Sequence, residues 1–230
     1  MLRGMPAKGD HQARLTAFYG KQAASYDLTR DRLLPGRRES MQDLASRLPD
    51  GAALVDLGGG TGSHLVHLGE AHQRLSRLDL VDLCPALLAK AQERVKERGW
   101  HHVHLHHADA TTWTPSHPVD AVICSFSLTM IPAWWLAIDQ AVRMLRPGGL
   151  LIVTDFTIAP RHGDATRLAH PAWMRVFWPW WFAHDGVRLN ADHLPYLRHA
   201  LHEVSCHEGF HRLPWIGLKV PYYRWVGRRP

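Results

Sequence analysis

The sequence predicts an α/β protein with one parallel β-sheet and helices on both of its faces. Between residues 50 and 156, short apolar runs alternate with longer stretches of helical periodicity, which is the pattern of successive strand–helix units. The first apolar run ends in a glycine-rich turn, residues 56–62, as a buried parallel strand does where it gives way to a helix. With 230 residues, of which 46% are hydrophobic, the chain fits one domain with a packed core.

The predicted elements follow in order along the chain. Residues 13–48 carry apolar positions at helical spacing, with few breakers before Pro35 and Gly36, and predict an N-terminal helical segment. Five strands are then expected, at 52–57, 78–82, 103–108, 119–125 and 150–156. The helices expected between them are 63–71, 85–98 (from Pro85 to the stop at Gly99) and one that ends at Arg146, before the sharp turn 147–149.

The alternation of strands and helices stops after Phe156. Residues 157–203 are rich in tryptophan, histidine and proline and are expected to form an aromatic helical cap. Residues 204–212 and 220–226 have the pattern of a closing strand pair. We therefore expect one domain over 1–230, divided into the helical segment 13–48, the sheet core 50–156, the cap 157–203 and the closing strands 204–230.

Composition narrows the function classes only in part. The formal charge of +6 permits contact with nucleic acid, anionic lipid or an acidic substrate and does not choose among them. Three separated cysteines form neither a disulfide framework nor a zinc pattern. Residues 1–12 lack the apolar core of a signal peptide, and no apolar run is long enough to span a bilayer. We expect a cytoplasmic protein, either free or attached peripherally to a membrane surface.

Acidic residues stand at the ends of the first three predicted strands. Asp56 precedes the turn glycines, Asp82 follows the last of them by about twenty residues, and Asp109 with Ala110 follows the third strand. In an open α/β sheet, ligands bind beyond the carboxyl ends of the strands. At that edge Asp82 can accept both hydroxyl groups of a ribose, and Asp109 can meet an adenine edge. The sequence thus predicts a nucleoside site.

Two features disfavour a nicotinamide dinucleotide as the bound nucleoside. The pyrophosphate fingerprint needs a glycine where this chain has Ser63. Asp56 would also repel a pyrophosphate, whereas it can hold the ammonium group of a methionine.

These motifs, together with residues 145–149, resemble those of class I S-adenosylmethionine-dependent methyltransferases. The resemblance covers residues 50–156 and implies a Rossmann-like fold with S-adenosylmethionine as cofactor. It is specific for the cofactor and says little about the substrate. The cofactor-binding residues expected from the motifs and flanks are Tyr26, Arg37, Asp56, Gly58, Gly60, Thr61, Gly62, Asp82, Leu83, Asp109, Ala110 and Ser125.

A narrower resemblance lies in the flanks of this core. The segments 18–19, 24–30, 36–37, 125–132, 176–178 and 220–227 are similar to the methyltransferase half of betaine-lipid synthases. The resemblance implies stepwise N-methylation of diacylglyceryl-homoserine to its trimethylated betaine lipid. A separate upstream enzyme would supply that lipid. One departure is Phe126, where the family leads us to expect a tyrosine.

Methyl transfer to an amine constrains the residues around the nitrogen. The amine must be neutral when it attacks, so a carboxylate or phenol should accept its proton, and aromatic faces suit the quaternary product. The candidates are Tyr19, Tyr26, Asp155, Tyr222 and Tyr223. Arg37 is a candidate partner for a carboxylate, because a guanidinium binds one in bidentate fashion. The histidine run 101–107 allows a metal site on strand geometry, but we expect no metal, since this chemistry needs none.

Residues 173–182 contain four tryptophans and two phenylalanines. Such a helix either packs on the core as a cap or lies on an anionic membrane surface, and the sequence leaves both readings open. Three further functions compete with the betaine-lipid reading. A phosphatidylethanolamine or small-molecule amine N-methyltransferase would share the cofactor motifs. A nucleic-acid enzyme should show clustered lysines, which this chain lacks. A binding module without activity would not need all three acids.

Overall fold

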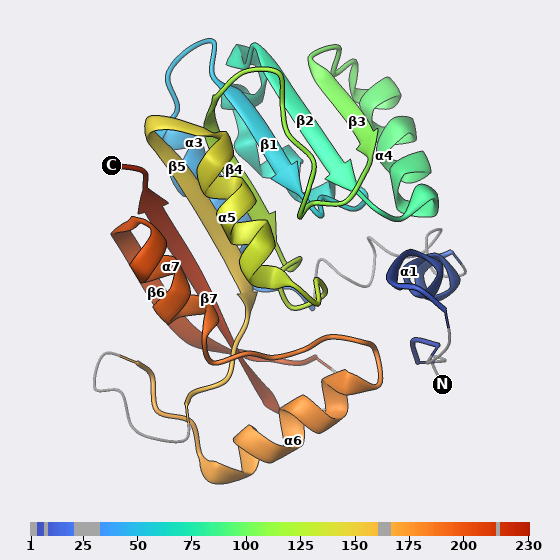
Figure 1. Cartoon of the computed structure of the whole chain (residues 1–230), viewed down its shortest axis with the longest axis vertical. Helices are drawn as coiled ribbons and strands as arrows, with labels where there is room; N and C mark the ends of the chain where they lie inside the picture. Colours follow the sequence, from blue (N-terminus) through green and yellow to red (C-terminus); the bar gives the residue numbers. More distant parts are fainter. Residues whose placement is uncertain (1–3, 7–8, 21–32, 161–166, 215–216) are drawn as a thin grey trace.

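A computed structural model describes residues 4–6, 9–20, 33–160, 167–214 and 217–230. Its centre is a seven-stranded sheet in the order β3-β2-β1-β4-β5-β7-β6 (Figure 1). The strands are β1 Ala53–Leu57, β2 Arg77–Asp82, β3 Val103–His107, β4 Val119–Ser125, β5 Leu145–Phe156, β6 His202–Arg212 and β7 Lys219–Arg228. β1 to β5 run parallel, while β7 is antiparallel to both β5 and β6. The predicted Rossmann-like fold and the closing strand pair are both present.

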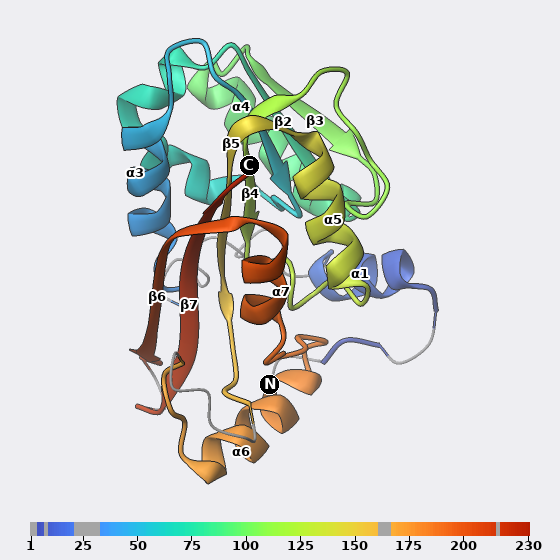
Figure 2. The same cartoon turned by 60° about the vertical axis from the view of Figure 1, so that its left-hand side comes forward.

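Helices cover both faces of the sheet because neighbouring strand residues point to opposite sides. On β1, Leu54 packs with the helices α3 (Arg37–Arg47), η1 (Ser63–Arg74) and α4 (Pro85–Arg98). The next residue, Val55, packs with α5 (Trp134–Met144) and α7 (His193–Ala200). Figure 2 shows the sheet nearly edge-on between α3 and the pair α5 and α7.

Most boundaries match their prediction, and the differences have local causes. α4 has the predicted bounds, with proline in its first turn and Gly99 closing it at φ 64°. The helix after the glycine turn is a 3₁₀ helix and is broken at Gly69, whose φ of 57° no helix accommodates. α5 ends at Met144, and β5 begins at Leu145 instead of Leu150, because Leu145 already pairs with Val119 before a register shift.

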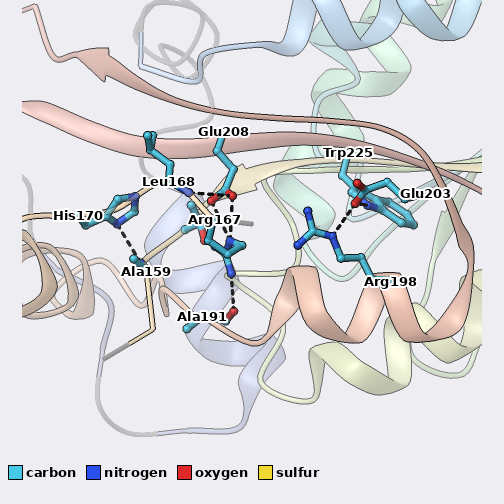
Figure 3. Close-up of polar contacts among 10 residues, drawn as sticks. Ala159, Arg167, Leu168, His170, Ala191, Arg198, Glu203, Glu208 and Trp225 are labelled. Atoms are coloured by element: carbon cyan, nitrogen blue, oxygen red, sulfur yellow. Dashed lines mark hydrogen bonds and ion pairs between the residues drawn. The ribbon is translucent and has the colours of Figure 1, made fainter. Parts of the chain in front are cut away.

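The predicted cap 157–203 consists of two different parts. α6 (Ala172–Ala183) lies beyond the carboxyl end of β5, whereas α7 packs beside α5 on the sheet (Figures 1 and 2). The segment before α6 is tied to β6 by a buried ion pair, in which Nε of Arg167 lies 2.9 Å from both carboxylate oxygens of Glu208 (Figure 3). The same guanidinium donates to the carbonyl oxygen of Ala191 at 3.0 Å.

The N-terminal helix α1 (His11–Tyr19) also lies at the carboxyl edge of the sheet (Figure 1). It begins where the Asp10 side chain accepts a hydrogen bond from the backbone of Ala13. Its buried side packs on Leu83, Cys84 and Leu87, at and after the end of β2. None of the helices in the described residues combines the length and the apolar character needed to cross a membrane.

Candidate functional site

The turn after β1 folds back on the end of β2. Gly58, Gly60 and Gly62 all have positive φ, between 58° and 71°, a region that other residues rarely adopt. The backbone N–H of Gly58 donates to the carbonyl oxygen of Val81 at 2.8 Å. A Cβ atom on Gly58 would lie 2.5 Å from Cβ of Ser127, so the loop after β4 also approaches this turn closely.

Asp82 is the polar centre of this edge. One carboxylate oxygen accepts the N–H of Gly60 at 2.8 Å, and the other accepts the N–H of Cys84 at 2.7 Å. Burial raises the pKa of this carboxyl group to about 6, although the two backbone donors act in the opposite direction. The side chain therefore holds the glycine turn on β2 and keeps its remaining lone pairs for a ligand hydroxyl.

Asp109 follows β3 and is exposed. Its Oδ1 accepts the backbone N–H of Thr111 at 2.8 Å and the hydroxyl of the same residue at 2.7 Å. The acid thus closes a tight turn that presents Ala110 to the same edge as Asp82.

A cavity of about 270 Å³ joins these strand ends. Of the predicted site residues, those that line it are Tyr19, Arg37, Gly58, Gly60, Thr61, Asp82, Leu83, Asp109, Ala110 and Ser125. Asp56, Gly62, Asp155, Tyr222 and Tyr223 are not among the lining residues, and Tyr26 lies outside the described residues. The sequence interpretation missed lining from α1 and from the loop after β4, chiefly His11, Leu15, Phe126, Ser127, Met130 and Ile131. The loop's position after a parallel strand was the signal that could have identified it.

Asp56 lies beneath the glycine turn. Its side chain is fully buried, and its Oδ2 lies 3.0 Å from Nε2 of the equally buried His64, without the alignment of a hydrogen bond. The glycine turn thus lies between this carboxylate and the cavity, and the contact of Asp56 with the cofactor stays a prediction.

Asp155, Tyr222 and Tyr223 belong to the packing around the cavity. The Asp155 carboxylate accepts the N–H of Thr129 at 3.0 Å, the hydroxyl of Thr129 at 2.6 Å and the N–H of Phe156 at 2.8 Å. Burial raises its pKa to about 6 and raises that of Tyr223 well above its usual range. Asp155 thereby fixes the loop after β4, and Tyr222 is half-buried beside Gly36. None of the three side chains is among those that line the cavity, and their catalytic role stays a prediction.

Arg37 and Phe126 form the wall opposite the strand ends. Arg37 is the first residue of α3, and its guanidinium carbon lies 5.6 Å from the centre of the Phe126 ring. Phe126 has a φ of 55°, a strained value for a residue with a side chain. Its N–H donates to the carbonyl oxygen of Thr154 at 2.7 Å, which holds it there. The wall therefore combines an aromatic surface with a cation suited to a carboxylate.

The histidines in and just before β3 turn to separate partners. His102 lies 2.9 Å from His72, and His106 lies 2.7 Å from the Asp79 carboxylate, each measured between side-chain polar atoms. Across the described part of the chain, no three histidine, cysteine or acidic side chains gather as metal ligands would.

The donor set of the cavity fits a nucleoside with an amino-acid tail. Asp82 supplies acceptors, Arg37 supplies a cation, and the buried hydroxyl of Ser125 has no partner within the described residues. Apolar side chains such as Leu83 and Leu87 flank these groups, as binding of an adenine ring requires.

Comparison with known proteins gives the family. Residues 54–149 match the family model described as a methyltransferase domain. The ubiquinone/menaquinone biosynthesis C-methyltransferase UbiE of Allorhizobium ampelinum is 27% identical over 158 residues, which cover 66% of this chain and 61% of that protein. The trans-aconitate 2-methyltransferase of an Azoarcus species is 30% identical over 157 residues, or 67% of this chain and 57% of that protein. The chain thus spans less than two thirds of the length of these relatives.

Solved structures agree with the fold. The N-methyltransferase NodS of Bradyrhizobium japonicum, in complex with S-adenosyl-L-homocysteine, has a TM-score of 0.69 at 20% identity and covers 94% of this chain and 98% of its own. The [4+2]-cyclase SpnF has a TM-score of 0.70 at 19% identity, covering 99% and 98%. Because that neighbour is a cyclase, fold alone does not fix the reaction. The family match, the glycine turn with its acidic strand ends and the shared fold together identify residues 54–149 of this chain as a class I S-adenosylmethionine-dependent methyltransferase domain, with S-adenosylmethionine as its cofactor.

Proposed function

We propose that this chain methylates the amine of diacylglyceryl-homoserine stepwise and gives the trimethylated betaine lipid. The proposal combines the narrow sequence resemblance in the flanks with one structural observation. Two of the resembling segments, 36–37 and 220–227, are far apart in the sequence and touch in the fold. A Cβ atom on Gly36 would lie 2.7 Å from Cδ of Arg224 and 2.9 Å from Cε2 of Tyr222.

This contact supports a shared role for the two segments. The β7 side chains hold the start of α3, and the next residue, Arg37, enters the cavity. The third segment contributes Phe126, whose ring lies under that guanidinium. Three of the six segments that carry the resemblance therefore meet around one cation in the cavity wall. A homoserine head group offers such a cation a carboxylate near the amine to be methylated.

The division of work in the cavity follows from its chemistry. When bound, S-adenosylmethionine supplies a methyl group already activated by the sulfonium charge, so the protein mainly positions the reactants and excludes water. Asp82 would hold the ribose hydroxyls, and Arg37 would orient a carboxylate. Tyr19 brings a phenol from α1 into the lining. Its oxygen can accept a hydrogen bond from the amine, and its ring suits the cationic product.

The deciding assay offers labelled S-adenosylmethionine with either diacylglyceryl-homoserine or phosphatidylethanolamine in detergent micelles. Mono-, di- and trimethyl products are followed by chromatography. We expect label in the homoserine lipid, up to the trimethyl product. Label in phosphatidylethanolamine alone would replace this proposal with its closest rival, and label in neither lipid but in a soluble amine would exclude a lipid acceptor.

Arg37 provides the sharper test, because it has a matched neighbour. Arg37→Gln should raise the KM for the homoserine lipid at least about tenfold, the value expected for loss of a charge-assisted pair. Arg38→Gln removes the same charge from the exposed adjacent position and should change KM less than twofold. Equal effects of the two substitutions would exclude a specific role for Arg37 in the cavity.

A further inference from the structure

The outer side of α6 is an exposed apolar stripe. Trp173, Val176 and Trp180 follow one another at helical spacing and are 48%, 73% and 72% exposed. The opposite side of the helix is buried through Met174 and Trp178. The helix is thus apolar on both sides, while its role as a cap uses only one of them.

This concentration is unusual on the surface of the described chain. Eight large hydrophobic side chains are exposed there, and four of them belong to α6: Trp173, Val176, Trp180 and Trp181. A fifth, Leu218, lies just before β7, whose first residue Lys219 accepts a hydrogen bond from the Trp178 indole at 3.0 Å. The end of the β6–β7 hairpin therefore packs against the buried side of α6 and brings a further exposed apolar side chain to this helix. A concentration of exposed apolar side chains of this kind marks an interaction site.

Exposed basic side chains lie on the neighbouring elements. Arg212 and Lys219 are exposed and lie opposite each other in the register of β6 and β7. Arg188 is exposed in the segment after α6. α6 itself contains Arg175 and no acidic residue. Tryptophan prefers the boundary between the acyl region and the head groups, and each basic residue near an anionic bilayer adds attraction. Charge and side-chain type therefore agree on one partner, an anionic lipid surface.

A continuous row of rings connects the buried side of α6 with the cavity. Phe126, in the cavity wall, contacts Phe156 with ring centres 4.8 Å apart, and Phe156 contacts Phe182 of α6 at 4.8 Å. Phe182 in turn contacts Trp178 at 5.6 Å. The buried side of α6 thus belongs to the same aromatic packing as Phe126 in the cavity wall.

We propose that α6 and the end of the β6–β7 hairpin dock this chain on an anionic bilayer, beside the wall at which the acceptor is methylated. The purpose of this docking rests on the lipid acceptor proposed above, but the docking itself is measured without any acceptor. The surface would let a lipid head group reach the cavity while its acyl chains stay with the membrane.

The experiment is sedimentation of the full chain with vesicles of phosphatidylcholine, with or without about one third phosphatidylglycerol. The wild type should bind the anionic vesicles, and added salt should weaken the binding. Val176→Ser combined with Trp180→Ser should lower the partition coefficient at least about tenfold, because two exposed apolar side chains no longer leave water. Val204→Ser, at an apolar position on β6 that is also exposed (38%), should change it less than twofold.

A second pair of variants tests the charge. Lys219→Glu should weaken binding to anionic vesicles at least about fivefold, while Lys96→Glu on α4 should not. Unchanged binding of the double apolar variant, or equal binding to neutral and anionic vesicles, would overturn the proposal. So would a lipid-free dimer that the double variant converts to a monomer, because a second copy would then cover the surface. Unchanged melting and unchanged cofactor affinity verify that the variants fold.

The two proposals fail separately. Methylation of a short-chain, water-soluble homoserine lipid should be the same in the double apolar variant as in the wild type. If the wild type binds vesicles yet methylates no homoserine lipid, the proposed function fails and docking stands. If it methylates the soluble lipid yet ignores vesicles, docking fails alone.

Discussion

The carboxylate of Asp82 offers the most quantitative test of the cofactor site. In Asp82→Asn the ribose hydroxyl groups would lose a charged acceptor, and one of the two backbone donors, Gly60 at 2.8 Å or Cys84 at 2.7 Å, would face an amide NH₂ in place of an oxygen. A hydrogen bond to a charged group contributes about 1.5–3 kcal/mol. With 1.4 kcal/mol for each factor of ten, loss of one such bond to the cofactor predicts roughly 10- to 150-fold weaker binding of S-adenosylmethionine. Asp82→Ala removes the acceptor altogether and should weaken binding at least as much.

Isothermal titration calorimetry measures this affinity directly. Asp50→Asn is the control, because Asp50 pairs with Arg74 on the exposed surface. Because the pKa of Asp82 is raised to about 6, protonation should weaken binding as the pH falls through that value, and Asp82→Asn should lose this dependence. An affinity within twofold of the wild type in both Asp82 variants, with unchanged melting, would refute the assignment of Asp82 to the cofactor.

Three further perturbations follow from the packing around the site. Asp155 has a pKa of about 6 in the fold against 3.8 when unperturbed. Its contribution to the free energy of unfolding should therefore fall by about 3 kcal/mol as the pH rises from about 4 to about 6. The free energy of unfolding of Asp155→Asn, measured by denaturation, should lack this pH dependence, and an unchanged dependence would contradict the assignment. Gly36→Ala should lower kcat/KM, because the new Cβ atom would meet Arg224 and Tyr222. Gly51 has a similar positive φ but open space around it, so Gly51→Ala should lose stability only. Equal activity in the two variants would contradict the link between β7 and the cavity. Arg167→Met should lower the free energy of unfolding, measured in urea, by about 3–5 kcal/mol, because it leaves Glu208 buried without its partner. The double variant with Glu208→Leu should recover most of this loss. A double variant as unstable as the single one would contradict this account.

The elements that sequence reasoning located best are those with chemical signals at their ends. Pro85 and Gly99 bracket α4, and β4 follows from a mainly apolar run that only Asp120 interrupts before Ser125. The acids at strand ends could be read from the sequence because parallel strands bring their carboxyl ends to one edge. This rule placed Asp82 and Asp109 at the cavity.

What escaped prediction depends on contacts between distant segments. Asp56 stands at a strand end like the other acids, but the turn folds over it and His64 lies beside it. No local pattern reveals that the Asp155 carboxylate accepts the hydroxyl of Thr129 or that Phe126 takes a left-handed backbone conformation. The split of the predicted cap into α6 and α7 likewise depends on which apolar side chains pack on the sheet, and the more apolar of the two stretches, α6, is not the one that packs there.

The position of β7 has a consequence for how the enzyme is made. Residues 219–228 form an interior strand, inserted between β5 and β6. During synthesis, the edge of β5 therefore stays without this neighbour until residues 219–228 have left the ribosome, and such an unpaired edge invites pairing with other chains. Because Tyr222 and Arg224 also pack on Gly36, the cation in the cavity wall gains its support in the same late event. The nascent chain can thus form its glycine turn early, but it completes the cavity wall around Arg37 only when β7 joins the sheet.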